Sequence, residues 1–181
     1  DTPETIRRDI AIIQEELPLD VIEFFCLTPL PGSEDHQVLW KKGVAMDPDL
    51  NTYDVEHVCT AHPKMGKQEW EDIYREAWSL YYTPTHMKTL LRRAVATGVP
   101  LGSLVKVLVT FATTVRLENV HPLQSGILRV KRPSERRPGL LRENPWIFWS
   151  RSAWETLSKH AILAGAIVRL LLTAIAISHA P

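Results

Sequence analysis

Cysteine is scarce in this chain of 181 residues, since only Cys26 and Cys59 occur. Two thiols cannot build the disulfide framework of a small secreted domain, and such sparse use is typical of a reducing compartment. Net charge is absent too, because 21 basic side chains balance 21 acidic ones. A neutral chain has no overall attraction for nucleic acid. We therefore expect a cytoplasmic protein that does not bind nucleic acid.

The amino-terminal segment lacks the apolar stretch of a secretory signal, because its pattern is charged and helical. Internal repeats and low-complexity tracts are also missing. The chain begins with Asp1 rather than Met, and we interpret it as a fragment of a longer protein. Apolar residues make up 45% of the composition, an ordinary globular balance that suffices for one core, or for a core with an extension.

The first 33 residues are patterned as a helix, a strand and a turn. Thr2 is suited to cap the helix, Pro3 to occupy its first position, and Pro18 to end it. The apolar run from Val21 to Leu27 predicts a strand covered on both faces, as in a parallel sheet. The turn that follows would stand at the carboxyl end of this strand, where ligands bind in α/β barrels and open α/β sheets.

The rest of the chain is patterned mainly as helices. We expect them over residues 34–42, 67–82, 84–97, 100–117 and 152–178. Residues 44–64 have no clear period and predict a long loop. The helix over 67–82 has one broad apolar face, which predicts core packing by Trp70, Ile73, Tyr74, Ala77, Trp78 and Tyr81.

Two stretches resemble a known enzyme family. The run from Asp1 through the first helix to Val21-Ile-Glu-Phe-Phe-Cys-Leu-Thr-Pro-Leu-Pro-Gly-Ser33 resembles the end of a radical S-adenosylmethionine (radical SAM) barrel. The later stretch is similar to the carboxyl-terminal extension of the subgroup that carries an amino-terminal cobalamin-binding domain. This second similarity rests on Tyr53-Asp-Val-Glu-His-Val58, His62-Pro-Lys-Met65, Tyr81-Tyr82, Arg92-Arg93, Glu118-x-x-His121-Pro-Leu123 and Arg136-Arg-Pro-Gly139.

The resemblance implies a fold of the class α/β to mainly α. Residues 1–33 would be the terminal helix–strand unit of a partial (β/α) TIM-like barrel, and residues 34–125 a helical extension. The implied chemistry is cleavage of S-adenosylmethionine by a [4Fe-4S] cluster, which starts radical chemistry on a small-molecule or lipid substrate. Cobalamin is a further cofactor of the subgroup. The implied wall of the S-adenosylmethionine pocket is Leu27, Thr28, Pro29, Leu30, Pro31 and Gly32.

One departure from the family is decisive. Radical SAM proteins bind their cluster through a Cys-x3-Cys-x2-Cys triplet, and this chain has none. Cys26 and Cys59 are 33 residues apart without a third partner. The resemblance therefore assigns the cluster to an upstream part of the same polypeptide, and we expect this chain alone to bind no cofactor and to contain no catalytic residue. A plain strand-terminating turn remains the alternative interpretation of residues 27–32.

Several further residues could have either a functional or a purely structural role. Glu56, His57, Cys59 and His62 are metal-ligating types, but their spacing matches no zinc pattern, so we predict no metal site. We interpret Cys26 as a small core residue. Glu23 either faces a polar partner or stands at an exposed strand end.

The carboxyl-terminal part combines a basic and aromatic arm over 126–151 with an apolar helix over 152–181. The arm contains Arg129, Lys131, Arg132, Arg136, Arg137, Arg142, Trp146, Phe148 and Trp149. Residues 161–177 are then apolar except for Arg169 and Thr173. This order is typical of a membrane-interface segment. We expect peripheral or re-entrant contact rather than a span, because an arginine in the middle of a span is costly.

Two alternatives stay open for this region. The apolar helix could dock on its own domain with Arg169 paired, and the basic arm could bind phosphate. A second function class follows as well: the chain could be a non-catalytic helical module that binds a membrane surface or a partner helix. The enzyme and the membrane interpretations are compatible, since an enzyme acting on a lipid would use both.

Overall fold

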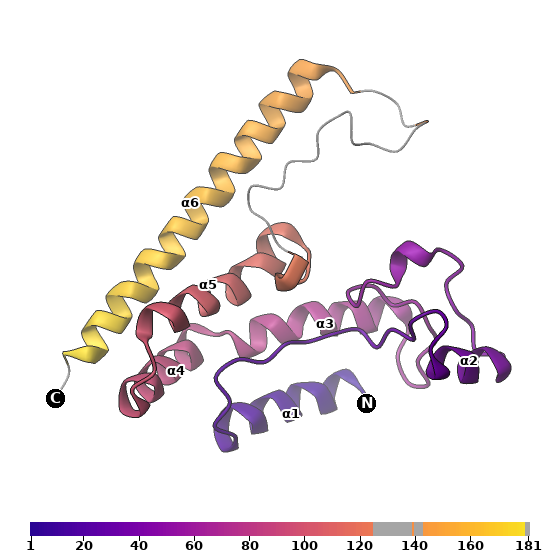
Figure 1. Ribbon diagram of the computed structural model, residues 1–181, viewed down its shortest axis with the longest axis horizontal. Helices are drawn as coiled ribbons and strands as arrows, with labels where there is room; N and C mark the ends of the chain where they lie inside the picture. The colour runs from indigo at the N-terminus through magenta and orange to yellow at the C-terminus, as the bar shows by residue number, and fades with distance from the viewer. Residues whose placement is uncertain (125–138, 140–142, 180–181) are drawn as a thin grey trace. The chain divides into compact units, whose positions relative to one another are not determined.

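The computed structural model describes residues 1–124, 139 and 143–179. These residues are mainly helical, as expected (Figure 1). Their elements are α1 (Pro3–Glu16), α2 (Glu34–Lys41), η1 (Leu50–Thr52), α3 (Lys67–Tyr81), α4 (Pro84–Thr97), α5 (Leu101–Glu118), η2 (Pro122–Gln124) and α6 (Pro145–Ser178), where η marks a short 3-10 helix. The chain divides into two compact units, residues 1–93 and residues 94–181.

The starts of the helices follow local capping chemistry. The Thr2 hydroxyl accepts a hydrogen bond from the Thr5 amide, and the Thr5 hydroxyl accepts one from the Thr2 amide at 2.9 Å, so the two residues form a capping box. Ser33 caps α2 through the His36 amide at 3.2 Å. Thr83 caps α4 in the same way through the His86 amide. The predicted starts of α1, α2 and α4 are confirmed.

Helix α6 begins seven residues before its predicted start at Ser152. The Asn144 side chain accepts a hydrogen bond from the Trp146 amide at 2.9 Å, and Pro145 occupies the first helical position. Residues 145–151 therefore belong to the helix and not to an arm. The basic residues predicted to form the arm between 129 and 142 lie outside the described residues.

The core of the first unit is built on α3, with α1 alongside it (Figure 1). The six side chains predicted to pack on one face of α3 are all buried. Trp78 packs against neighbouring rings: its ring centroid lies 5.3 Å from that of Phe24 and 6.4 Å from that of Tyr74, both edge-on, and 6.1 Å from that of Tyr82, stacked. Gln14 on α1 donates to the carbonyls of Leu80 and Tyr81 at 3.0 Å, which satisfies acceptors at the end of α3.

The strand predicted over Val21–Leu27 is absent. In residues 1–124 and 143–179 the only β pairing is an isolated antiparallel bridge between Met46 and Thr60. A strand needs a neighbouring strand to form a ladder, and here side chains and a loop bind the backbone instead. The partial-barrel unit is therefore not seen among the described residues, whose mainly helical structure is consistent with the predicted helical extension.

Residues 19–28, which we call the tethered segment, run along α3 (Figure 1). The Tyr82 hydroxyl donates to the Ile22 carbonyl at 2.7 Å and accepts from the Ile22 amide at 3.2 Å. The Cys26 amide donates to the Val55 carbonyl at 2.7 Å. These bonds satisfy polar backbone groups that would otherwise need a sheet neighbour.

Burial in the tethered segment follows a period of two, except that Glu23 is half-buried on the otherwise exposed side. Cys26 is buried and Ile22 and Phe24 are half-buried, whereas Val21, Phe25 and Leu27 are 37%, 49% and 68% exposed. This alternation is typical of an extended backbone with one covered face. The predicted cover on both faces is not complete among the described residues, because Val21 and Leu27 remain exposed on the side away from α3.

Tyr82→Phe removes the one hydroxyl that binds both backbone groups of Ile22. We expect the free energy of unfolding to fall by about 1–3 kcal/mol, because a partly buried donor and acceptor lose their partner. Tyr53→Phe is the control, since its half-buried hydroxyl makes a single bond, to the Asp47 carbonyl at 3.0 Å. Chemical denaturation measures both variants. An unchanged stability of Tyr82→Phe would contradict the tether.

Candidate functional site

The predicted cofactor wall, residues 27–32, ends in a tight turn. The Ser33 amide donates to the Leu30 carbonyl at 2.9 Å, and Gly32 has a φ of +90°. Proline followed by a glycine of positive φ in the two central positions defines a type II turn. Gln37 on α2 donates to the Gly32 carbonyl at 3.3 Å. Gly32 thus has the left-handed backbone conformation that favours glycine, whereas cofactor binding by this turn stays a prediction.

The side chains of the turn are divided between a buried base and an exposed rim. Pro29 is buried, and the Thr28 hydroxyl donates to the Cys26 carbonyl at 3.0 Å. Leu27 and Leu30 are 68% and 57% exposed, and Pro31 and Gly32 are exposed too. The turn thus presents an apolar rim on an anchored backbone.

The loop beneath the tethered segment is held in a strained conformation. Val55, whose carbonyl accepts from Cys26, has a φ of +65°, which is unfavourable for a β-branched residue. Asp54 compensates by accepting from the amides of Glu56 and His57, both at 3.0 Å. Burial opposes ionisation of Asp54, but these amides and the His57 ring, 2.7 Å away, hold its pKa below the ordinary value.

Among the four residues of metal-ligating type in this region, the two histidines bind different partners. His57 pairs with Asp54, and the Nδ1 atom of His62 accepts from the amides of Lys64 and Met65 at 3.1 Å. Among the residues that the structure describes, no group of three or more His, Cys, Asp or Glu side chains is arranged to hold a metal. The polar contacts of His57 and His62 shape the loop.

Both cysteines are 1% exposed. Burial raises the pKa of Cys26 to about 12. Burial also raises the pKa of Cys59, and a hydrogen bond with Thr28 opposes that shift. Neither thiol is poised to become a thiolate at neutral pH, which is the form that ligates metals or reacts.

A cavity of about 370 Å³ lies in the same unit, and no sequence pattern predicts it. Its walls come from residues 45–47, 58–62 and 65–67, with Trp70 from α3. The Asp47–Lys67 ion pair, 3.2 Å long, stands in its polar wall, and the His62 ring meets Trp70 edge-on at 4.9 Å. The β-bridge between Met46 and Thr60 joins residues that are 14 apart in the sequence. No turn motif between them predicts this pairing.

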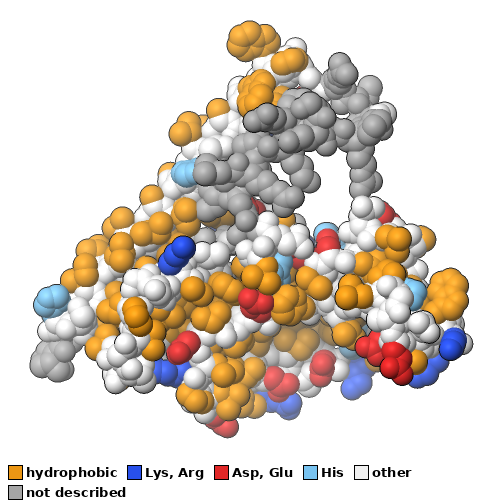
Figure 2. Space-filling model, viewed as in Figure 1, with side chains coloured by type: hydrophobic (Ala, Val, Ile, Leu, Met, Phe, Trp, Pro, Cys, Tyr) orange, Lys and Arg blue, Asp and Glu red, His pale blue; other side chains and the backbone are white. Residues whose placement is uncertain are grey.

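A second feature lies in the other unit, where α5 packs on α6. Leu170 and Ala174 of α6 are buried. What we call the open face of α6 comprises Trp154, Leu157, Val168, Leu172 and Ile175, five of the large apolar side chains of this helix that are more than half exposed. Figure 2 shows apolar side chains gathered along the length of this helix.

Comparisons of the chain with protein-family models, with curated proteins and with solved structures give no match.

The buried thiols provide a direct test of the loop packing. We expect iodoacetamide to leave Cys26 and Cys59 unmodified in the native protein at pH 8, because both are inaccessible and have raised pKa values. In denaturant, both should be modified. Mass spectrometry of the peptides reads out each site. Fast modification of Cys26 in the native protein would mean that the tethered segment does not rest on the loop.

Proposed function

We propose that this chain is the carboxyl-terminal portion of a radical SAM enzyme of the subgroup with a cobalamin-binding domain. The tethered segment is then the last barrel strand, and residues 27–32 form part of the S-adenosylmethionine wall. The [4Fe-4S] cluster belongs to an upstream part of the same polypeptide. The substrate is a small molecule or a lipid.

One observation supports this proposal above all: motifs that carry the family resemblance meet on the tethered segment. The Tyr81 hydroxyl donates to the Leu19 carbonyl at 3.0 Å, and Tyr82 binds both backbone groups of Ile22. Arg93 donates to the same Leu19 carbonyl at 3.1 Å. These contacts bridge 60 to 74 residues of sequence, so three separate motif residues serve one element.

A further motif, Tyr53 to Val58, contacts the same element. The Val55 carbonyl accepts from the Cys26 amide, and the Glu56 carbonyl lies 3.3 Å from the Cys26 sulfur. The strained backbone of Val55 places its carbonyl for this hydrogen bond. A role for these motifs in holding the last strand accounts for their presence without requiring that they touch substrate.

The uncovered side of the tethered segment also supports the proposal. Val21 and Leu27, whose side chains are 37% and 68% exposed, lie on that side. Strands of a parallel barrel are covered on both faces. A barrel contributed by upstream residues would bury these side chains and supply the missing ladder partner.

The chain's own residues contribute binding and positioning in this proposal. When bound, the cluster supplies the electron that cleaves S-adenosylmethionine. Gly32 has no side chain, so a ligand could approach the backbone of the turn closely. Pro29 and Pro31 restrict the backbone on either side of Leu30, so the turn loses little conformational entropy when a ligand binds.

The test uses the longer polypeptide that includes the upstream residues. After anaerobic reconstitution with iron and sulfide, we expect the charge-transfer absorption of an iron–sulfur cluster. Gly32→Val should weaken S-adenosylmethionine binding by about tenfold or more, a loss of about 1.4 kcal/mol, because its side chain would project into the pocket wall. Equilibrium binding to the reconstituted protein measures this.

Gly43→Val is the matched control for that experiment. Gly43 also has a positive φ, +67° against +90° for Gly32, and a Cβ at either position meets nothing within 4 Å. Both variants therefore carry backbone strain, but only Gly32 lies in the proposed wall. Missing cluster absorption, or equal loss of binding in the two variants, would contradict the proposal.

A second function of a different class is supported by α6, namely attachment to a membrane surface. The helix is long and apolar enough to cross a membrane by length and composition, and only 11% of its most apolar window is buried. Trp146, Trp149 and Trp154 are 84%, 52% and 74% exposed on its amino-terminal half. Tryptophan is enriched where a membrane meets water.

Energetics favour surface attachment over a span. Nine Leu, Ile and Val residues between 162 and 177 favour insertion by about 3–5 kcal/mol in total, and Arg169 opposes it by about 2.5–3.5 kcal/mol. The balance is close to zero. Helix α5 packs on α6 and carries the exposed Lys106, so a span would either bury this charge or separate the two helices. Attachment at the surface avoids both costs.

Flotation with liposomes tests the attachment. We expect the intact chain to float, and a chain that ends at Arg142 to remain at the bottom of the gradient. Leu172→Glu is the full-length comparison: its side chain is 62% exposed on the open face, so the charge should abolish flotation while circular dichroism stays unchanged. Equal, negligible flotation of the intact and truncated chains would refute membrane attachment.

A further inference from the structure

We infer that α6 lies flat in the headgroup layer of an anionic membrane, with its open face embedded and the Arg169 guanidinium bound to lipid phosphate. This inference rests on the membrane attachment proposed above and specifies the orientation of the helix and the class of lipid. It follows from where the side chains of α6 lie around the helix axis.

The residues of the open face lie on one side of the helix. At about 100° per residue, Trp154, Leu157, Val168, Leu172 and Ile175 all fall within a sector of roughly 60°. These residues span most of the helix, which is 34 residues and so about 50 Å long. The buried Leu170 and Ala174 lie on the opposite side. The helix therefore has a packed face and an open face along the same length, which suits a flat orientation.

Arg169 stands at the edge of the open face. It follows Val168, so it projects about 100° round the axis from the middle of the open face. For a helix embedded by that face, such a position is at the level of the headgroups, and the arginine stem can extend along apolar surface while its charge stays among polar groups. In a spanning helix the same residue would sit near mid-membrane.

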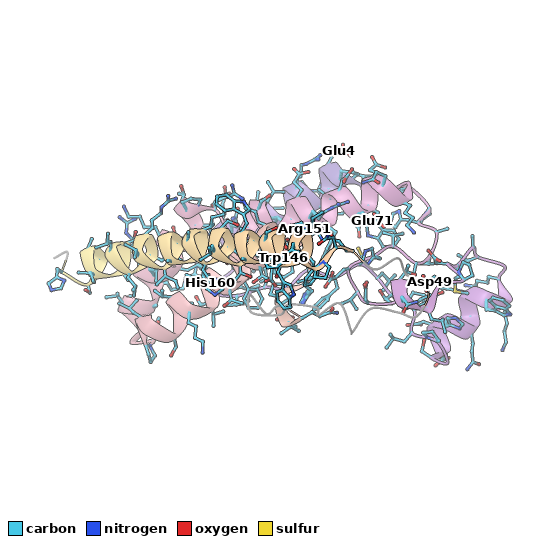
Figure 3. All side chains as sticks on the ribbon, turned by 90° about the horizontal axis from the view of Figure 1, so that it is seen from above. Glu4, Asp49, Glu71, Trp146, Arg151 and His160 are labelled. Atoms are coloured by element: carbon cyan, nitrogen blue, oxygen red, sulfur yellow. The ribbon has the colours of Figure 1, made fainter. Side chains whose placement is uncertain are left out.

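Arg151 occupies the equivalent position five turns earlier, because 18 residues separate it from Arg169. The two guanidinium groups differ in what they bind. Arg151 pairs with Glu143 at 2.8 Å, at the end of α6 where Figure 3 labels it beside Trp146. For Arg169, no ion pair is found within residues 1–124 and 143–179. One flank of the helix therefore carries a neutralised cation and an available one.

Charge complementarity identifies phosphate as the ligand of Arg169. A guanidinium donates two parallel hydrogen bonds to a phosphate, a geometry that suits lipid headgroups. An anionic lipid adds a negative surface potential that attracts basic side chains, whereas the phosphate of phosphatidylcholine is neutralised by its own choline group. The exposed tryptophans at the amino-terminal half add the interfacial anchors expected for the same depth.

The experiment measures binding of the full chain to two kinds of vesicle, pure phosphatidylcholine and phosphatidylcholine mixed with phosphatidylglycerol. We expect tighter binding to the mixed vesicles. Arg169→Gln should weaken binding to them about fivefold and leave binding to pure phosphatidylcholine nearly unchanged. The double variant Arg151→Gln with Glu143→Gln is the matched control on the same flank, and it should keep the wild-type preference because it removes an ion pair without changing the net charge.

Each other result overturns a defined part of the inference. Equal affinities of Arg169→Gln and wild type on mixed vesicles would eliminate the phosphate contact. Resistance to alkaline carbonate extraction, increased further by Arg169→Leu, would mean that α6 spans the membrane. A lipid-free dimer abolished by Leu172→Glu would show that a second copy covers the open face. Failure of wild type to bind either vesicle would refute membrane attachment itself, and the enzyme proposal would stand unaffected.

Discussion

The attachment of residues 19–28 to α3 is the constraint on which the first unit depends. Two anchors fix the segment: the Tyr82 hydroxyl holds Ile22, and the Val55 carbonyl holds Cys26. Between them, Phe24 packs against Trp78. The loop beneath and the turn after Pro29 take their positions from the second anchor. Polar backbone groups of an apolar segment are thus satisfied without a sheet, which is unusual because a ladder is the ordinary solution.

Local signals predicted the helices well, because each depends on residues close in sequence. Thr2, Ser33 and Thr83 mark the starts of α1, α2 and α4, and the face of α3 follows from its period. The start of α6 was placed too late because the aromatic run hid the Asn144-Pro145 cap. The strand over 21–27 was predicted from apolarity alone, but a strand also needs a partner, and none is present among the described residues.

The candidate site was predictable only in part. Gly32 in its type II turn follows from the Pro-Gly pair. The cavity bounded by Asp47, Lys67 and Trp70 was not predictable, since it is created by a bridge between two irregular stretches. The availability of Arg169 was equally hidden, because the difference between it and Arg151 arises from Glu143 and not from either arginine. A sequence pattern identifies the residues of a candidate site, whereas the three-dimensional contacts determine which of their charges are already paired.

The distance between the tethered segment and its anchors matters during synthesis. Arg93, which binds the Leu19 carbonyl, is 74 residues further along the chain. At about 5–20 residues per second, ribosomes need roughly 4–15 seconds to add those residues. For that time Val21 to Leu27, a run rich in β-forming side chains, lacks contacts that residues 78–93 make with the tethered segment in the folded unit. In the nascent chain this segment is therefore accessible to chaperones and prone to aggregation for several seconds. The hydrogen bonds of the Tyr82 hydroxyl to Ile22 help to end that interval.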